Sequence, residues 1–332
     1  MRPGGARTDV EQDAAPAARR GAADLLLLLL AGCLALYLVQ PRWFSAPGVE
    51  AWGTVFAAIC LQALPFLVLG VLVSAAVSLV PASFFERALP RSPALAVPVA
   101  GAAGAVLPGC ECASVPVAGG LVRRGVPPAA ALAFLLSAPA INPVVVVATV
   151  VAFPDEPGMA VARFAASLLV ALLMGWLWAA LGRGDWLRLP RRAADDPGGG
   201  RARRFVDVAQ HDFVHAGGYL VLGGAAAATM SVLVPRSWLD AVAGNAVASV
   251  LLLALLAVVL SICSEADAFV AASLTSFSLT SRLVFLVVGP VVDLKLVALQ
   301  SGTFGGRFAL RFAPVTFVVA IGCALLVAGV LL

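Results

Sequence analysis

The composition of this chain of 332 residues is that of a membrane protein. The chain is 61% hydrophobic and 12% charged, with a mean hydropathy of +1.01 and a formal net charge of +4. Soluble proteins carry roughly 25% charged residues, so the composition excludes a soluble protein and leaves no room for a separate soluble domain. The arginines are spread over loops, so we expect a lipid bilayer as the environment and no nucleic-acid partner.

The N-terminal region contains a polar tail and a first apolar run. Residues 1–20 are rich in Pro, Gly, Ala and charged residues, which is typical of a disordered tail. Ala22–Val39 is long for a signal-peptide core and lies deep in the chain, so we interpret it as a membrane span.

Further apolar runs are long enough to cross the hydrocarbon core, which takes about 20 residues. They predict an all-α, polytopic membrane protein. The candidate spans are Ala22–Val39, Thr54–Val80, Pro128–Phe153, Met159–Leu181, Phe213–Val234, Arg282–Leu299 and Phe312–Leu332.

Two other apolar segments contain residues that break helices. Ala94–Val122 holds several prolines, and Ala241–Leu274 is interrupted by the polar run Ser261–Asp267. Proline and polar groups at membrane depth need protein groups or cavity water as partners. We therefore predict that both segments are broken or re-entrant at mid-membrane, either as hairpins or as broken spanning helices.

The chain also repeats itself. Leu67–Gly70 recurs as Leu220–Gly223, and Cys110 and Cys263 follow the two glycines at the same distance, so one offset of 153 residues relates both pairs. Duplication with interruptions at matching positions points to a transporter site near the bilayer midplane. The predicted parts are a first membrane half 21–182 (repeat core 54–153), a cytoplasmic linker 183–212 and a second membrane half 213–332 (repeat core 213–300).

The arginines favour one topology for the two halves. With a cytoplasmic N-terminus and two hairpins, most of the 22 basic residues lie in the cytoplasm, where such residues are enriched. The remaining ones are Arg42, Arg163, Arg236 and Arg282 outside and Lys295 within the membrane. This arrangement makes the two halves inverted relative to each other.

The first chemical motif is Pro108–Pro116, with Cys110, Glu111 and Cys112 at the predicted start of a helix. A helix N-terminus carries partial positive charge and favours thiolate. Together with Cys263 of the other repeat, these thiols would suit a soft, thiophilic species. The alternative is that they are small, well-packed residues at a tight break.

The second motif places carboxylates inside an apolar stretch, where they are costly and mark ion or proton paths. We expect Glu265 or Asp267 to bind and release a proton, with Lys295 as a counter-charge. The candidates for proton or ion coupling also include Asp293 and Glu111, and the alternative is a static internal ion pair.

Ser137 and Asn142 lie beside two prolines in another apolar run, where they would either line a passage or accompany a plain proline kink.

His211 and His215 share one helical face. Their spacing can hold a metal ion, but such a pair more often lies at the membrane interface. The sequence has no nucleotide-binding fingerprint and no hydrolase triad. We therefore expect that the protein binds no cofactor and is not an enzyme.

Four motifs together carry a family resemblance: Pro108–Pro116, Leu132–Pro143, Cys263–Ser273 and Gly289–Lys295. From about Thr54 to the C-terminus the chain resembles the predicted permease family that includes the ArsP organoarsenical efflux permeases. The resemblance implies a multi-pass plasma-membrane permease. For the best-known members it implies export of trivalent methylated or aromatic arsenicals with cysteine ligands, and for some relatives links to metal homeostasis and a second membrane subunit.

Three functions therefore follow from the sequence. The first is a secondary transporter that exports a thiophilic small solute, captured by Cys110 with Cys112 or Cys263 and coupled to protons. The second is a permease for a divalent metal ion such as zinc. The third is a non-transporting membrane subunit of a two-component complex. The expected partners are a small-molecule or metal(loid) substrate and a second membrane subunit or a second copy of the chain.

Overall fold

A computed structural model gives the fold of residues 47–90, 92–106, 111–189, 200–233 and 245–332. The chain divides into two compact units, residues 1–53 and Thr54–Leu332. All described residues belong to the second unit, apart from residues 47–53 at the start of helix α3. The predicted tail 1–20 and the predicted span Ala22–Val39 lie outside the described residues.

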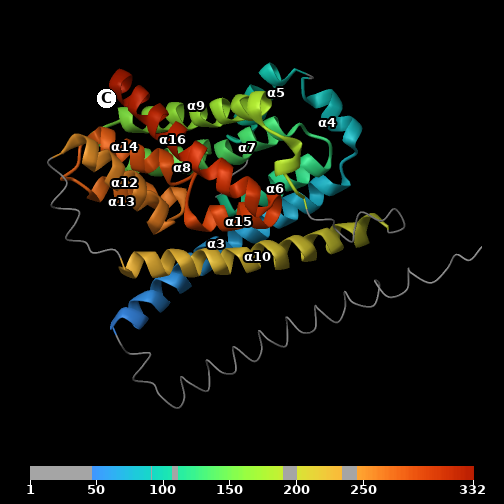
Figure 1. Ribbon diagram of the computed structural model, residues 1–332, viewed down its shortest axis with the longest axis horizontal. Helices are drawn as coiled ribbons and strands as arrows, with labels where there is room; N and C mark the ends of the chain where they lie inside the picture. Colours follow the sequence, from blue (N-terminus) through green and yellow to red (C-terminus); the bar gives the residue numbers. More distant parts are fainter. Residues whose placement is uncertain (1–46, 91, 107–110, 190–199, 234–244) are drawn as a thin grey trace, which may run out of the picture. The chain divides into compact units, whose positions relative to one another are not determined.

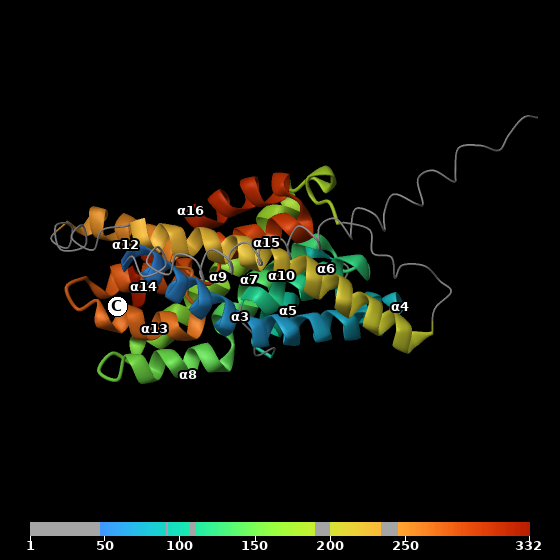
Figure 2. The ribbon, with the colours of Figure 1, turned by 90° about the horizontal axis from the view of Figure 1, so that it is seen from below.

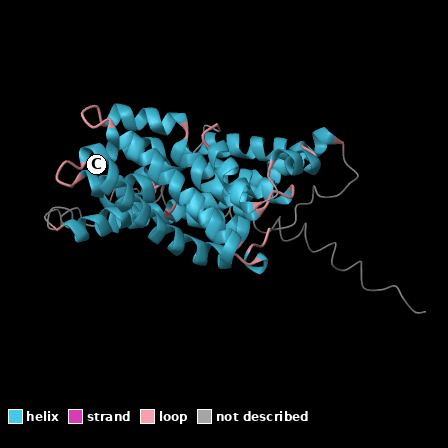
Figure 3. Ribbon diagram, turned by 90° about the horizontal axis from the view of Figure 1, so that it is seen from above, coloured by secondary structure: helices cyan, strands magenta, loops and turns pink. Residues whose placement is uncertain are grey.

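The described residues contain helices and connecting loops and no strand, which confirms the all-α class (Figure 3). The helices of the first half of the chain are α3 (Pro47–Leu79), α4 (Ala82–Ala88), α5 (Pro93–Ala103), α6 (Glu111–Arg123), α7 (Pro128–Ile141), α8 (Pro143–Ala152) and α9 (Gly158–Leu181).

Part of the predicted linker 183–212 is helical. Helix α10 starts at Arg201, so it includes residues 201–212. The elements of the second half are the short 3₁₀ helix η1 (Gly184–Trp186), α10 (Arg201–Leu233), α12 (Ala246–Leu260), α13 (Ser264–Ser273), α14 (Leu279–Val288), α15 (Leu294–Phe304) and α16 (Gly306–Leu331).

The helix boundaries follow the sequence repeat. Helices α3 and α10 both have 33 residues. Helices α6 and α13 begin at Glu111 and Ser264, and α5 and α12 begin at Pro93 and Ala246, so the offset of 153 residues holds in both pairs. Among the described residues, the helices α3 and α5–α9 therefore have counterparts in the same order in α10 and α12–α16.

Within the described residues, five helical stretches are long and apolar enough to cross a membrane. They match predicted spans in position. They are Gly48–Leu79, Pro128–Ala152, Gly158–Leu181, Arg201–Leu233 and Gly306–Leu331.

One predicted span contains a break in its helix. Arg282–Leu299 is not a continuous helix, because α14 ends at Val288 and α15 begins only at Leu294. Pro290 has no N–H group to continue the helical hydrogen bonds, and Asp293 caps the helix that follows. Pro128–Ala152 has a smaller interruption of the same kind, at Asn142 before Pro143.

Both segments predicted to be broken are broken. Ala94–Val122 forms α5 and α6, and Ala241–Leu274 forms α12 and α13, with a break at Ser261–Cys263. Ser261 ends α12 in the left-handed region, with φ of 47°. That each segment turns back within the bilayer stays a prediction.

Helices α7 and α14 are the most buried helices of the two halves, with 13 of 14 and 7 of 10 residues buried. Each packs against the last helix of its own half, α9 or α16, and these two also pack against each other (Figure 1). The broken helices cross between the halves: α13 packs against α8 (Figure 2), and α6 packs against α15.

The outer faces of the helices are apolar. Helix α8 exposes Val144, Val147 and Val151, whereas its Val145 and Thr149 are buried. A soluble protein would place polar residues on such a face, but hydrocarbon chains are as apolar as valine. The exposed side of this helix is therefore suited to lipid.

Candidate functional site

The N-termini of the two broken helices α6 and α13 meet inside the protein. Their first residues, Glu111 and Ser264, occupy equivalent positions in the repeat, and the Ser264 hydroxyl donates a hydrogen bond of 3.4 Å to Glu111 Oε2. Helix N-termini present free N–H groups and partial positive charge. The fold thus brings two such ends to one buried place.

An ion pair occupies this place. Lys295 of α15 lies 2.5 Å from Glu111 Oε1 and 3.6 Å from Asp293 Oδ2, and all three residues are about 1% exposed or less. Lys295 also donates to the Ser261 carbonyl at 3.0 Å, at the break that follows α12. The charges of Lys295, Glu111 and Asp293 therefore satisfy one another away from water.

The sequence predicts that Lys295 provides the counter-charge for the carboxylate of Glu265 or Asp267. The nearest carboxylates are instead those of Glu111 and Asp293. Glu111 has Ser264 as its repeat equivalent, so the repeat gave no signal for its pairing. The only signal was its position next to the predicted helix break.

Two thiols lie around the same ammonium group. Cys112 of α6 and Cys263, the N-cap of α13, are 0% and 2% exposed, and both are close enough to Lys295 to interact with its charge. Cys112 directly follows Glu111 and Cys263 directly precedes Ser264, the two residues that meet between the repeats. Cys110 lies outside the described residues.

Ser261 holds the break after α12 in place. Its hydroxyl donates to the Val258 carbonyl at 3.0 Å and accepts from the Leu294 N–H at 3.2 Å. A left-handed conformation is unfavourable for a residue with a side chain. These bonds, with that from Lys295 to its carbonyl, support the conformation and join the break to the start of α15.

Asn142 and Asp293 have the same structural role in the two halves. The Asn142 side chain accepts from the Val145 N–H at 3.0 Å and caps α8, and the Asp293 carboxylate accepts from the Leu296 N–H and caps α15. Asn142 also donates to the Ala138 carbonyl at 3.0 Å. Ser137, likewise buried, donates to the Phe134 carbonyl at 3.1 Å.

The acidic residues of α13 lie in different surroundings. Asp267 is 2% exposed, and its Oδ2 has no hydrogen-bond partner among the described residues, whereas Glu265 is half-buried. Oδ2 lies close to Gly289, where a methyl group would come within 2.6 Å of it. The carboxyl of Asp267 is therefore packed against the break between α14 and α15.

Arg163 is a functional candidate that the sequence interpretation missed, since it placed this residue outside the membrane. Arg163 is 1% exposed within α9 and donates to the Ser264 carbonyl at 2.8 Å and to the Thr149 hydroxyl at 2.9 Å. It is also close enough to Asp267 and Glu265 for its charge to interact with theirs. A single arginine within the apolar run Met159–Leu181 was the available signal.

The histidine pair holds two helices together. His211 and His215 stack with ring centroids 5.8 Å apart, and His215 Nε2 donates to the Gly302 carbonyl of α15 at 2.9 Å. No group of three His, Cys, Asp or Glu side chains suited to a metal ion occurs in the part of the chain that the structure describes.

Comparison with known proteins gives the family of the chain. The profile of the family ArsP_1, described as a predicted permease, matches residues 49–330. The chain belongs to this predicted permease family. The match covers the helices, the breaks and the buried ion pair described above, so these are features of a permease-family membrane protein.

The chain aligns with two relatives over nearly the whole length of each relative. The chain is 35% identical to the UPF0718 protein YcgR of Bacillus subtilis over 291 residues, which are 83% of this chain and 96% of that protein. It is 28% identical to a proposed two-component membrane permease complex subunit of Streptococcus mutans over 281 residues, 82% of this chain and 93% of that protein. No solved structure matches the chain.

Proposed function

We propose that this permease is a secondary transporter that exports a thiophilic small solute, such as a trivalent organoarsenical. The observation that carries the proposal is the position of two buried thiols, Cys112 and Cys263. Each is the chain neighbour of a residue in the hydrogen-bonded pair Glu111–Ser264, where equivalent helices of the two halves meet. Soft thiolate ligands select soft ions and metalloids. The lysine and the two helix N-termini favour the thiolate form that such binding requires.

Capture would proceed by ligand exchange. A trivalent methylated arsenical carries two exchangeable oxygen ligands. Each thiol would replace one of them, forming an S–As bond and breaking an As–O bond, and its proton would leave with the oxygen as water. Two cysteines held together, Cys112 and Cys263 or either with Cys110, supply the two sulfur atoms.

Proton coupling is the second part of the proposal. Glu111, Asp267 and Asp293 are buried carboxyl groups of this region, while Arg163 and Lys295 are its buried cations. An unpaired charge in a low-dielectric interior is costly, and such a group takes up a proton instead. Asp267, whose Oδ2 has no hydrogen-bond partner in the described part of the chain, is the best-placed residue for the proton, with Glu265 beside it.

The third part concerns topology. We propose that α5–α6 and α12–α13 are hairpins that enter from opposite sides, so that the halves form an inverted repeat with a cytoplasmic N-terminus. Alternating access would expose the thiols to one side at a time. The buried thiols of this structure would then correspond to a closed state.

The test is methylarsenite resistance in a sensitive bacterial strain that expresses the protein. We expect Cys112→Ser and Cys263→Ser to abolish resistance. The matched control is Cys323→Ser, a buried cysteine in the unbroken helix α16. Equal protection by the two site variants and the unaltered protein, at equal protein levels, would exclude capture by these cysteines. Flux of radioactive zinc in vesicles would reveal a metal cargo instead.

A second candidate function is that of a membrane subunit that works with a partner. It is favoured by the name of the Streptococcus mutans relative, a proposed subunit of a two-component membrane permease complex. Purified protein in liposomes separates the two functions. Solute uptake by the protein alone supports the autonomous transporter, whereas uptake only after a second membrane protein is added supports the subunit.

A further inference from the structure

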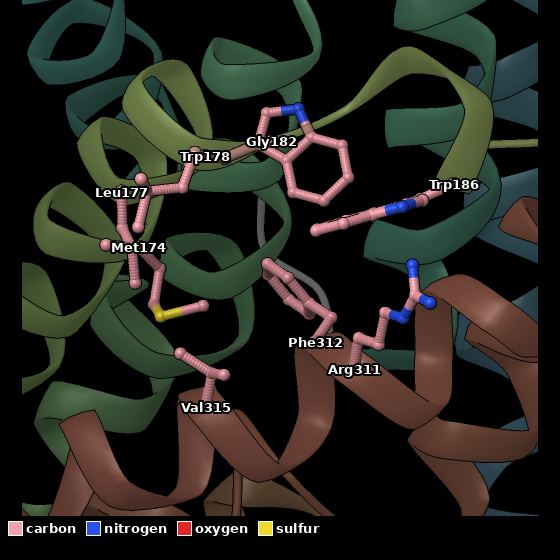
Figure 4. Close-up of a pocket in the computed structure, with 9 residues that line it drawn as sticks. Met174, Leu177, Trp178, Gly182, Trp186, Arg311, Phe312 and Val315 are labelled. Atoms are coloured by element: carbon pink, nitrogen blue, oxygen red, sulfur yellow. The ribbon is translucent and has the colours of Figure 1, made fainter.

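A cavity lies at the junction of α9, η1 and α16, on a different part of the molecule from the ion pair. It has a volume of about 330 Å³, within the range of about 300–1,000 Å³ that is typical of small-molecule sites. Figure 4 shows its two ends: Trp178, Trp186 and Arg311 surround one end, and Met174, Leu177 and Val315 line the other.

The aromatic end is rigid and carries a cation. The Arg311 guanidinium lies 4.5 Å from the centroid of the Trp186 ring, and Trp186 packs edge-on against Trp178 with centroids 6.2 Å apart. A guanidinium over an indole face is attracted to it. This contact holds the Arg311 charge at the mouth of the cavity, where the side chain stays exposed.

This end of the cavity also has the features of a membrane interface. Tryptophan is enriched where lipid head groups meet hydrocarbon, and α9 ends here, at Leu181. The segment 182–189 that follows α9 holds the exposed Arg183 and Arg188, and its one acid, Asp185, pairs with Arg183 at 3.2 Å. The mouth therefore has an excess of positive charge.

The opposite end has the chemistry of a hydrocarbon chain. Met174 and Leu177 belong to α9 and Val315 belongs to α16, and Val315 is 42% exposed on the outer face. A ligand with an anionic head and an apolar tail matches both ends at once. Basic pockets between membrane helices on the cytoplasmic side bind anionic lipid head groups.

We propose that this cavity binds an anionic phospholipid, with its phosphate on Arg311 and one acyl chain against Met174, Leu177 and Val315. The lipid seals the junction between the last helices of the two halves, α9 and α16, which pack against each other. The site binds lipid whatever solute the permease carries.

The test measures lipid binding to the purified full chain in neutral detergent by native mass spectrometry. Phosphatidylglycerol and phosphatidylcholine with the same acyl chains are compared. We expect retention of phosphatidylglycerol in preference to phosphatidylcholine. Arg311→Gln should weaken phosphatidylglycerol binding by about fivefold, the effect of about 1 kcal/mol per basic residue at a membrane surface. The control Arg203→Gln removes an exposed arginine of α10 and should change nothing.

A second pair of variants tests the acyl-chain end. Val315→Trp fills the cavity from its exposed side and should abolish binding of both lipids, whereas Val318→Trp, one turn further along α16 and 68% exposed, should not. Equal binding of the two lipids by the unaltered protein, or unchanged binding in both Arg311→Gln and Val315→Trp, would overturn the proposal. Loss of binding in the two control variants to the same degree would also overturn it.

Discussion

Lys295 is the residue on which the buried cluster depends. Its ammonium group contacts Glu111, Asp293 and the Ser261 carbonyl, and two thiols lie within reach of its charge. Removal of one member of a buried ion pair leaves an uncompensated charge, which costs far more than the pair contributes. The same group therefore satisfies both acids and the carbonyl at the break after α12.

At this scale we predict that Lys295→Met lowers the free energy of unfolding by about 3–5 kcal/mol, because it leaves Glu111 charged and unpaired in the interior. The double variant Lys295→Met with Glu111→Gln should recover part of that loss. Thermal unfolding in detergent measures the loss of stability in the two single variants, Lys295→Met and Glu111→Gln, and in the double variant. A double variant whose loss equals the sum of the two single losses would show that the pair is not coupled in the folded protein.

Two helix pairs pack with their backbones in close contact at glycine residues. Gly223 of α10 faces α15, and a methyl group at this position would lie 2.6 Å from the Lys295 Cα. Gly70, its equivalent in the other half, faces the Ala113 backbone of α6 in the same way. Small residues let membrane helices approach closely. The duplicated glycines thus allow two helices to pack directly against those that carry Lys295 and Glu111.

We predict that Gly223→Ala destabilises the protein by about 1–3 kcal/mol, the usual cost of overpacking, because backbone atoms of α15 cannot rotate away. The matched control is Gly218→Ala on the same helix, where a methyl group would meet nothing within 4 Å. That change should be neutral or stabilise by up to about 1 kcal/mol through helix propensity. Equal unfolding temperatures of the two variants in detergent would refute close packing at Gly223.

The orientation of the two halves relative to the membrane is a property of the whole molecule. Each half has the same helix order, and the broken helix of each half packs against a helix of the other. An inverted repeat would place equivalent turns on opposite sides of the membrane. The turn between α6 and α7 follows Arg123 and Arg124, which favours the cytoplasm, whereas the turn between α13 and α14 lacks such residues.

Labelling of single cysteines tests this arrangement. With the native cysteines replaced by serine, we expect a membrane-impermeant maleimide to label Ser276→Cys in intact cells. It should label Pro127→Cys only after the cells are permeabilised. Both positions are exposed in turns, so access to the reagent differs only by the side of the membrane. Labelling of both positions from the same side would exclude the inverted repeat.

Features that depend on short stretches of chain could be predicted from the sequence. Apolar runs predicted the helices, the prolines and polar residues of Ala94–Val122 and Ala241–Leu274 predicted their breaks, and the offset between Gly70 and Gly223 predicted the repeated helix order. These properties are local because a span needs only enough consecutive apolar residues, and a break needs only a residue that cannot continue the helical hydrogen bonds.

The partners of the buried charges could be identified only in the folded protein. The pairing of Lys295 with Glu111 and the burial of Arg163 against the Ser264 carbonyl both join segments that lie far apart in the chain. A buried charge must find a partner wherever the fold brings one, and neither periodicity nor spacing along the chain encodes that partner.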